Sequence, residues 1–218
     1  MQNNKNIFEF YQSSGLYDRV IFKNKNKKNS PTLEKLKEKI LSLKNIYSKQ
    51  SDQLVFSDGN SKSKIMLIGD SPGISDEING KPFSEDTGLL LDKMLEAINL
   101  DRNKVYLTNI VNFRLPDNRK LSENDIVNFQ PLILDHIKII NPELIMILGS
   151  DALKTLFNEQ QSITKIRGKW LKLRINNYTY SCMSSYHPNF LIRQPSQKKF
   201  AWSDLQEFRD RILKEKLC

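Results

Sequence analysis

The chain has 218 residues, of which 39% are hydrophobic and 27% charged, as in a soluble globular protein of one α/β domain with short extensions. Two cysteines exclude a disulfide framework and a cysteine-rich metal site, and the absence of a signal peptide or a membrane-length apolar run leads us to expect a cytoplasmic protein. The formal net charge of +9 suits a polyanionic partner such as nucleic acid.

The first 53 residues predict a helical extension. Apolar side chains within residues 4–22 indicate a short amphipathic helix, and residues 23–31 form a basic polar linker. Thr32 is expected to cap a helix whose apolar residues recur at helical spacing from Leu33 to Ile46. We therefore divide the chain into an extension of residues 1–53 and a main domain of residues 54–218.

From residue 64, short apolar runs alternate with helical patterns. The expected strands are residues 65–68, 105–111, 144–148, 170–175 and 178–183, and the expected helices are residues 88–98, 122–140, 150–157 and 203–215. This alternation predicts a three-layer α/β fold with a mostly parallel central sheet.

Several side chains predict where helices begin or bend. Ser122 and Asp125 form a capping box, and Ser150 and Ser203 are expected N-caps. Pro131 is expected to kink or divide the long middle helix.

In an open α/β sheet the ligand site lies beyond the carboxyl ends of the strands. Here those ends are residues 69–73 (GDSPG), 108–109 (TN), 149–150 (GS) and 184–188 (SSYHP). Three of the four carry residues able to hold a polar ring, so we expect the site at this edge of the sheet.

Ordered motifs over residues 54–213 resemble the family-4 uracil-DNA glycosylases. The first half contains residues 69–73 (GDSPG), 80–83 (GKPF), 105–109 (VYLTN) and 114–119 (RLPDNR). The second half contains residues 145–149 (IMILG), 167–170 (RGKW), 187–193 (HPNFLIR) and 202–205 (WSDL). The resemblance implies the fold of that family and an enzyme that flips uracil out of DNA and hydrolyses its N-glycosidic bond.

The resemblance also implies an iron–sulfur cluster held by four cysteines, but this chain has none at the corresponding positions. Phe113 and Phe129 occupy the middle pair, and residues 42–57 contain no cysteine. Because a cluster needs thiolate ligands, we expect no metal and no cofactor, with apolar packing in the cluster's place.

The motifs place three side chains around the flipped base. Phe83 is expected to stack on the ring, and Asn109 to accept from uracil N3–H and donate to O4, a pattern that cytosine inverts. His187 is expected to donate a hydrogen bond to uracil O2 as negative charge develops there. His136, within a helical pattern, is expected to be structural.

The residues that would activate water depart from the family. Asp70 and Ser71 stand where the family has Glu and Ala, and Ser71 is a poor general base. Both are assigned to catalysis, and Asp76 is assigned to the substrate pocket as an assistant.

The DNA-binding set consists of residues that would contact the strand as the base leaves. Leu191 resembles an apolar wedge that fills the vacated stack, and Arg193 a phosphate contact. Asn189, Arg114 and Arg119 extend this surface. We expect a monomer that binds single- or double-stranded uracil-DNA.

Other readings stay open. Residues 69–71 (GDS) with His187 resemble the start of an SGNH-type serine hydrolase, although Ser184 stands where that group places its Asp. A non-catalytic binder of uracil or distorted DNA would explain the altered Asp70 and Ser71. An active enzyme could also act on another deaminated base, such as hypoxanthine or xanthine.

Overall fold

One mixed β-sheet forms the centre of the domain. The computed structural model describes residues 32–44, 53–158 and 162–217, which lie in one compact unit. Within them six strands follow the order β1-β3-β2-β4-β6-β5. Their bounds are β1 Asp58–Gly59, β2 Ile65–Gly69, β3 Tyr106–Asn109, β4 Leu144–Leu148, β5 Trp170–Ile175 and β6 Tyr178–Ser185. The central strands β3, β2, β4 and β6 are parallel, and β1 and β5 are antiparallel edges.

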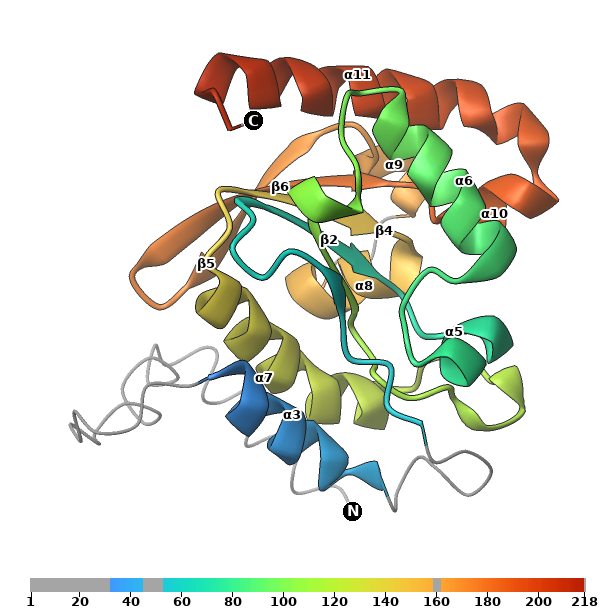
Figure 1. Ribbon diagram of the computed structural model, residues 1–218, viewed down its shortest axis with the longest axis vertical. Helices are drawn as coiled ribbons and strands as arrows, with labels where there is room; N and C mark the ends of the chain where they lie inside the picture. The colour runs from blue at the N-terminus through green and yellow to red at the C-terminus, as the bar shows by residue number, and fades with distance from the viewer. Residues whose placement is uncertain (1–31, 45–52, 159–161, 218) are drawn as a thin grey trace. The chain divides into compact units, whose positions relative to one another are not determined.

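Helices cover both faces of the sheet, as Figure 1 shows. The helices are α3 Leu33–Leu41, α5 Ile74–Asn79, α6 Glu85–Glu96, α7 Glu123–Ile140, α8 Ser150–Phe157, α9 Ile163–Ile166, α10 Pro188–Arg193 and α11 Lys198–Glu215, with short 3-10 turns η1 Arg102–Lys104, η2 Pro116–Asn118 and η3 Pro195–Gln197. The apolar residues of α3, α7, α8 and α9 form one core cluster with the sheet, and those of α6, α10 and α11 form the other. The expected three-layer α/β fold is confirmed.

The strands are buried on both faces because their residues alternate between the two clusters. Met66 and Ile68 face the α7 side, whereas Ile65 and Leu67 face the α6 side. This pattern explains why the strands read as continuous apolar runs in the sequence rather than as alternating ones.

The predicted caps have mixed outcomes. Thr32 accepts from the Lys35 amide at 3.3 Å, and Ser122 and Asp125 form the reciprocal capping box. The cap prediction for Ser203 is wrong, because α11 begins five residues earlier and the Ser203 hydroxyl donates back to the Lys199 carbonyl. Ser150 is the first residue of α8, with Gly149 at the cap position.

Pro131 does not divide α7, which runs without a break from Glu123 to Ile140. Proline removes the donor for the carbonyl four residues earlier, that of Val127. Val127 and Pro131 are both exposed, so the proline lies on the outer face of the helix.

Helix α3 belongs to the same compact unit as the sheet, since Leu36 and Ile40 are buried in the cluster that includes α7. The helix predicted within residues 4–22 and the basic linker lie outside the described residues, and the boundary at residue 53 stays a prediction. Among the described helices, none is long and apolar enough to cross a bilayer.

Candidate functional site

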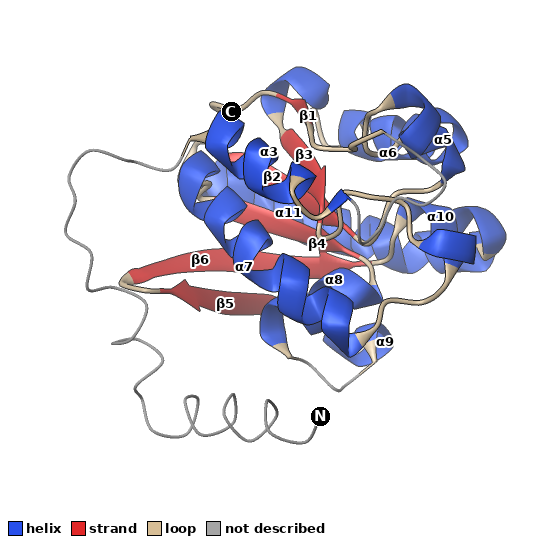
Figure 2. Cartoon of the chain, turned by 90° about the horizontal axis from the view of Figure 1, so that it is seen from below, coloured by secondary structure: helices blue, strands red, loops and turns tan. Residues whose placement is uncertain are grey.

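The loops that follow the four parallel strands meet at one edge of the sheet. The register places Gly69 opposite both Asn109 and Leu148, and Leu148 opposite Ser185. The residues after these strands therefore converge, and Figure 2 shows α5 and α10 at this end of the sheet.

Phe83 lies between Asn109 and His187. Its ring is 1% exposed and stacks on the His187 imidazole, with the ring centroids 5.4 Å apart. A Cβ atom on Gly69 would lie 2.6 Å from Phe83 Cζ and 2.5 Å from Asn109 Oδ1. Only glycine at the end of β2 lets these two side chains come together here.

The side-chain amide of Asn109 is unpaired among the described residues but not fully enclosed. Asn109 is 2% exposed, and its amide makes no hydrogen bond with any described residue. Its oxygen and nitrogen are not among the enclosed, unpaired side-chain atoms of the described residues, so they retain some contact with solvent. This amide is therefore available to a ligand with matching donors and acceptors.

The backbone of α10 orients His187. Its Nδ1 accepts the Asn189 N–H at 3.2 Å, so the proton of the neutral ring sits on Nε2. Burial, with a contribution from the charge of Arg193, lowers the pKa of His187 to about 4. Near neutral pH the ring is an uncharged hydrogen-bond donor through Nε2.

Asp70 is directed at the start of α8. Its Oδ1 accepts the Ala152 N–H at 2.8 Å, and burial raises its pKa to about 7, with a further contribution from the charge of Asp151. A Cβ on Gly149, whose φ is 120°, would lie 2.2 Å from the Asp70 carboxylate. Ser71 is partly buried, and its hydroxyl makes no hydrogen bond to any residue described.

Asp76 was predicted to lie in the substrate pocket, but both of its carboxylate oxygens accept hydrogen bonds from backbone N–H groups. Oδ2 accepts the Gly73 N–H at 2.8 Å, and Oδ1 accepts the Ser84 N–H at 2.7 Å. The side chain therefore joins the loop after β2 to the loop that carries Phe83.

The residues predicted to contact DNA fall into two environments on α10. Asn189 and Arg193 are exposed, and Arg193 donates to the Asn189 carbonyl. Leu191 is 1% exposed and packs in the core cluster of α6 and α11, whereas its neighbour Ile192 is 38% exposed.

Arg114 and Arg119 are both held in ion pairs. Arg114 Nε donates to Glu77 at 2.7 Å, and Arg119 makes two hydrogen bonds to the Asp125 carboxylate. Arg119 holds the pKa of Asp125 well below its usual range, with help from Ser122. These guanidinium groups order the loop before α7.

The described residues do not fit an iron–sulfur cluster. Phe113 and Phe129 are buried in the core cluster shared by α3 and α7. Cys182 is buried in β6, and no group of three His, Cys, Asp or Glu residues in the described ranges could hold a metal ion. His136 lies in the same cluster region, stacked on Phe56 and hydrogen-bonded to the Tyr106 hydroxyl at 2.7 Å.

Two arginines that were not predicted to be functional support the site. Arg167 lies over the rings of Tyr186 and Phe200 and pairs with Asp204, which also accepts from the Ser185 hydroxyl. The motif at residues 167–170 is the sequence signal for it. Arg102 donates to the Phe83 carbonyl at 2.7 Å, and no motif indicated this contact.

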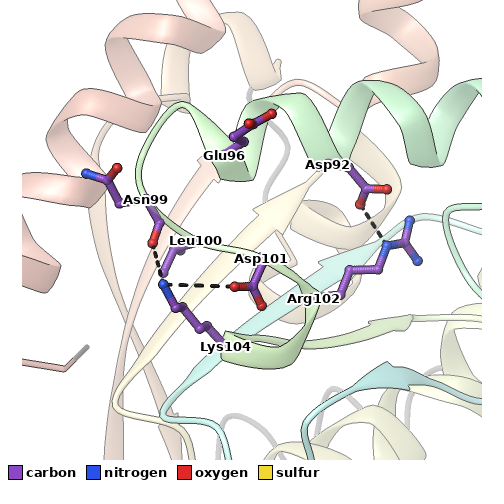
Figure 3. Close-up of a pocket in the computed structure, with 7 residues that line it drawn as sticks. All are labelled: Asp92, Glu96, Asn99, Leu100, Asp101, Arg102 and Lys104. Atoms are coloured by element: carbon purple, nitrogen blue, oxygen red, sulfur yellow. Dashed lines mark hydrogen bonds and ion pairs between the residues drawn. The ribbon is translucent and has the colours of Figure 1, made fainter.

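A surface pocket of about 590 Å³ lies elsewhere, beside the C-terminal half of α6 (Figure 3). Its lining includes Asp92, Glu96 and Asp101 against Arg102 and Lys104. Lys104 precedes β3, so this wall lies toward the amino end of the strand whose carboxyl end carries Asn109. The acidic lining disfavours DNA phosphates here.

Comparison with known proteins identifies relatives of this fold and site. Residues 56–206 match the family model described as the uracil DNA glycosylase superfamily. A type-4 uracil-DNA glycosylase of Saccharolobus solfataricus is 34% identical over 160 residues, which are 71% of this chain and 74% of that protein. A type-4 uracil-DNA glycosylase of Sulfurisphaera tokodaii is 32% identical over 185 residues, 82% of this chain and 84% of that protein.

A DNA polymerase of Bacillus phage SP01 is 28% identical over 149 residues, only 16% of its length. The similarity to that protein is therefore confined to a region of the size of this domain. Because the family model covers well over half of the residues, and relatives above 30% identity align over most of their lengths, this chain belongs to the uracil-DNA glycosylase superfamily.

Proposed function

We propose that this protein is a uracil-DNA glycosylase that flips uracil out of DNA and hydrolyses its N-glycosidic bond, leaving an abasic site. One observation carries the proposal. Phe83, Asn109 and His187 converge at the carboxyl edge of the parallel strands, and the Asn109 amide has no partner among the described residues. The relatives named type-4 uracil-DNA glycosylases support the same activity.

Recognition of the flipped base rests on Phe83 and Asn109. The base stacks on the Phe83 ring once entry of the nucleotide uncovers this 1% exposed side chain, and stacking by itself accepts any pyrimidine. The Asn109 amide accepts from uracil N3–H and donates to O4. Cytosine presents the opposite pattern and would leave the buried amide unpaired, so the site rejects it.

Cleavage rests on His187. As the glycosidic bond breaks, the sugar gains oxocarbenium character and negative charge accumulates on uracil. The neutral imidazole donates from Nε2 to uracil O2 and stabilises the departing anion. A preorganised donor of this kind contributes about 3–4 kcal/mol to transition-state stabilisation.

Water attack rests on Asp70 and Ser71. A carboxylate whose pKa is about 7 is matched to proton transfer near neutral pH. The water oxygen bonds to the sugar carbon while its proton passes to Asp70, and the Ser71 hydroxyl orients the water. Asp76 assists indirectly by ordering the loop that carries Phe83.

The DNA strand is held mainly by α10. Asn189 and Arg193 contact the phosphates, and Ile192 is better placed than the buried Leu191 to enter the vacated stack. Arg114 and Arg119 contribute less, because each is already paired with a carboxylate. We further propose that the protein is a cytoplasmic monomer that uses no cofactor.

The serine-hydrolase reading gains no support from the geometry. His187 Nδ1, which an orienting acid would occupy in such an enzyme, accepts a backbone N–H instead. Ser184, at the position of that acid, is buried in β6.

The proposal is tested with labelled oligonucleotides that carry uracil, cytosine, thymine or hypoxanthine, followed by alkaline cleavage of abasic sites. We expect strand cleavage at uracil alone. In Asn109→Asp the carboxylate no longer donates to O4, so uracil excision should fall about 100-fold. Asn99→Asp, a substitution in the distant pocket, serves as the matched control and should retain wild-type activity.

Ser71 favours a second candidate, a protein that binds uracil-DNA without cleaving it, because a hydroxyl is a weak base. Tight, uracil-dependent binding without abasic sites would support this candidate over the enzyme. If the protein neither cleaves nor binds uracil-DNA, both candidate functions are contradicted.

A further inference from the structure

The backbone that carries Phe83 adopts an unusual conformation. Phe83 has φ 54° and Glu85 has φ 48°, values in the left-handed region that residues other than glycine seldom adopt. Such a conformation persists only where neighbouring groups hold it, and it is common at binding sites.

Two ionisable side chains hold the peptide unit between Phe83 and Ser84 from opposite sides. Its carbonyl oxygen accepts from Arg102 Nη2 at 2.7 Å, and its N–H donates to Asp76 Oδ1 at 2.7 Å. The C=O and N–H of a trans peptide point in opposite directions, so the two contacts together fix the rotation of the peptide plane.

Both side chains are themselves anchored. Arg102 also donates to Asp58 and Asp92, each at 2.7 Å, and Figure 3 shows its contact with Asp92 on α6. The second oxygen of Asp76 accepts the Gly73 N–H at the start of α5. The held peptide is thereby tied to β1, α5 and α6.

Helix α6 leaves room for this arrangement only because residue 88 is glycine. A Cβ atom there would lie 2.2 Å from the Phe83 carbonyl oxygen and 2.8 Å from Arg102 Nη2. At the other end of Phe83, the ring tip reaches Gly69 and Asn109. Rotation of the 83–84 peptide would therefore move the ring relative to Asn109 and His187.

We propose that Asp76 and Arg102 form a two-sided peptide clamp that positions Phe83 for the flipped base. Both side chains bond to the backbone of this peptide, so we assign them as positioning residues that act through Phe83. The inference rests on the stacking role proposed for Phe83. Without Arg102 the peptide is free to leave the left-handed conformation, and the ring no longer presents its face beside Asn109.

A double-mutant cycle on kcat/KM for a single-stranded uracil oligonucleotide tests the clamp. We expect Phe83→Ala to lower kcat/KM about 30-fold and Arg102→Met about 10-fold, mainly through KM, since stacking stabilises the bound base. In the Phe83→Ala background, Arg102→Met should change kcat/KM less than twofold, because the ring through which it acts is gone.

Arg211→Met is the matched control. It removes an arginine of similar exposure that pairs with Glu215 on α11, and kcat/KM should not change. Arg102→Lys is the second variant, in case Arg102→Met fails to fold, because it keeps the positive charge beside Asp58 and Asp92. It should also raise KM, because the three acceptors are reached by three separate nitrogens of the guanidinium and a single Nζ cannot span them.

The outcomes separate the clamp from the role of Phe83. If Phe83→Ala leaves kcat/KM unchanged, the stacking role fails and the clamp fails with it. If Phe83→Ala lowers kcat/KM but neither Arg102 variant does, the clamp alone is overturned. Losses that multiply in the double mutant would also overturn it, because Arg102 would then act independently of the ring.

Discussion

At the scale of single residues, the site combines a neutral histidine with a carboxylate that titrates near neutral pH. Burial acts on both groups but in opposite directions, lowering the pKa of His187 to about 4 and raising that of Asp70 to about 7. His187 therefore keeps one protonation state near neutral pH, whereas Asp70, the proposed base, changes its protonation state in this range.

The dependence of rate on pH should report Asp70 and not His187. Only the ionised carboxylate accepts a proton, so kcat should rise between pH 5 and 9 in a single step centred near 7. Single-turnover rates measure this step. Asp70→Asn should be about 100-fold slower and flat across the range. A step that persists in Asp70→Asn would assign it to another group.

Asp70 should also make stability depend on pH. Its folded pKa exceeds the unfolded value of 3.8, so between about pH 4 and 7 the folded state binds more protons and stability falls as pH rises. The shift corresponds to about 4 kcal/mol at most. Thermal melts of Asp70→Asn should show a gain over wild type at pH 8 that is much smaller at pH 4. An equal gain at both values would contradict a raised pKa.

At the scale of elements, the packing of α10 determines which of its apolar side chains is exposed and so available for the proposed insertion into DNA. The sequence motif indicated Leu191, but only the three-dimensional packing shows that Leu191 is buried and Ile192 exposed. The six residues of α10, which is separated from the end of β6 by two residues, place one apolar side chain inward and the next outward.

Alanine substitutions separate the two residues. Ile192→Ala should weaken binding and excision on duplex uracil-DNA about 10-fold with unchanged stability, because the vacated stack is not filled. Leu191→Ala should lower the free energy of unfolding by about 2–4 kcal/mol, as expected for a cavity in the core. Urea denaturation and duplex excision rates measure both effects. A stable Leu191→Ala protein with impaired excision would restore Leu191 as the wedge.

The apolar cluster between α3 and α7 stands where the resemblance placed an iron–sulfur cluster. Phe113 and Phe129 fill core positions, so Phe129→Ala should lower the free energy of unfolding by about 3–5 kcal/mol. Leu213→Ala, at an exposed position of α11, is the control and should change it little. Purified protein should contain no iron, and stoichiometric iron with a chelator-sensitive melt would contradict this account.

At the scale of the whole molecule, the sequence predicted the architecture well because strand–helix alternation and buried apolar runs are local patterns. The same local patterns located β2, β4, β5 and the start of β6, together with the capping of α3 and α7. Short elements such as α5 and α10 were not predicted, since six residues carry too little periodicity. The early start of α11 was missed because Ser203 resembled a cap.

The site could be predicted only in part. Phe83, Asn109 and His187 stand in motifs, and the parallel register explains why these motifs lie together. The contacts of Arg102 and Asp76 with the 83–84 peptide depend on chain segments far apart in sequence, and no local signal reports them. The ion pair of Arg114 with Glu77 was hidden for the same reason, whereas Arg119 pairs with Asp125 only six residues away and was missed because Asp125 was assigned to the cap alone.

The positive net charge predicts a salt-dependent affinity whose slope reports individual phosphate contacts. Arg193→Ala should reduce the slope of log K against log salt by about 0.7 on single-stranded DNA, because its guanidinium is exposed. Arg119→Ala should reduce it less, because the Asp125 carboxylate already neutralises that charge. Equal reductions measured by fluorescence anisotropy would contradict this assignment.

His187 is proposed to stabilise uracil as it departs from the sugar. The most direct measurement is the single-turnover rate of abasic-site formation in a uracil oligonucleotide by wild-type and His187→Ala proteins, both with confirmed native melts. We expect uracil-dependent cleavage by the wild type and a loss of about 100- to 1000-fold in His187→Ala. Unchanged excision by His187→Ala, or no excision by the wild type, would contradict this proposal.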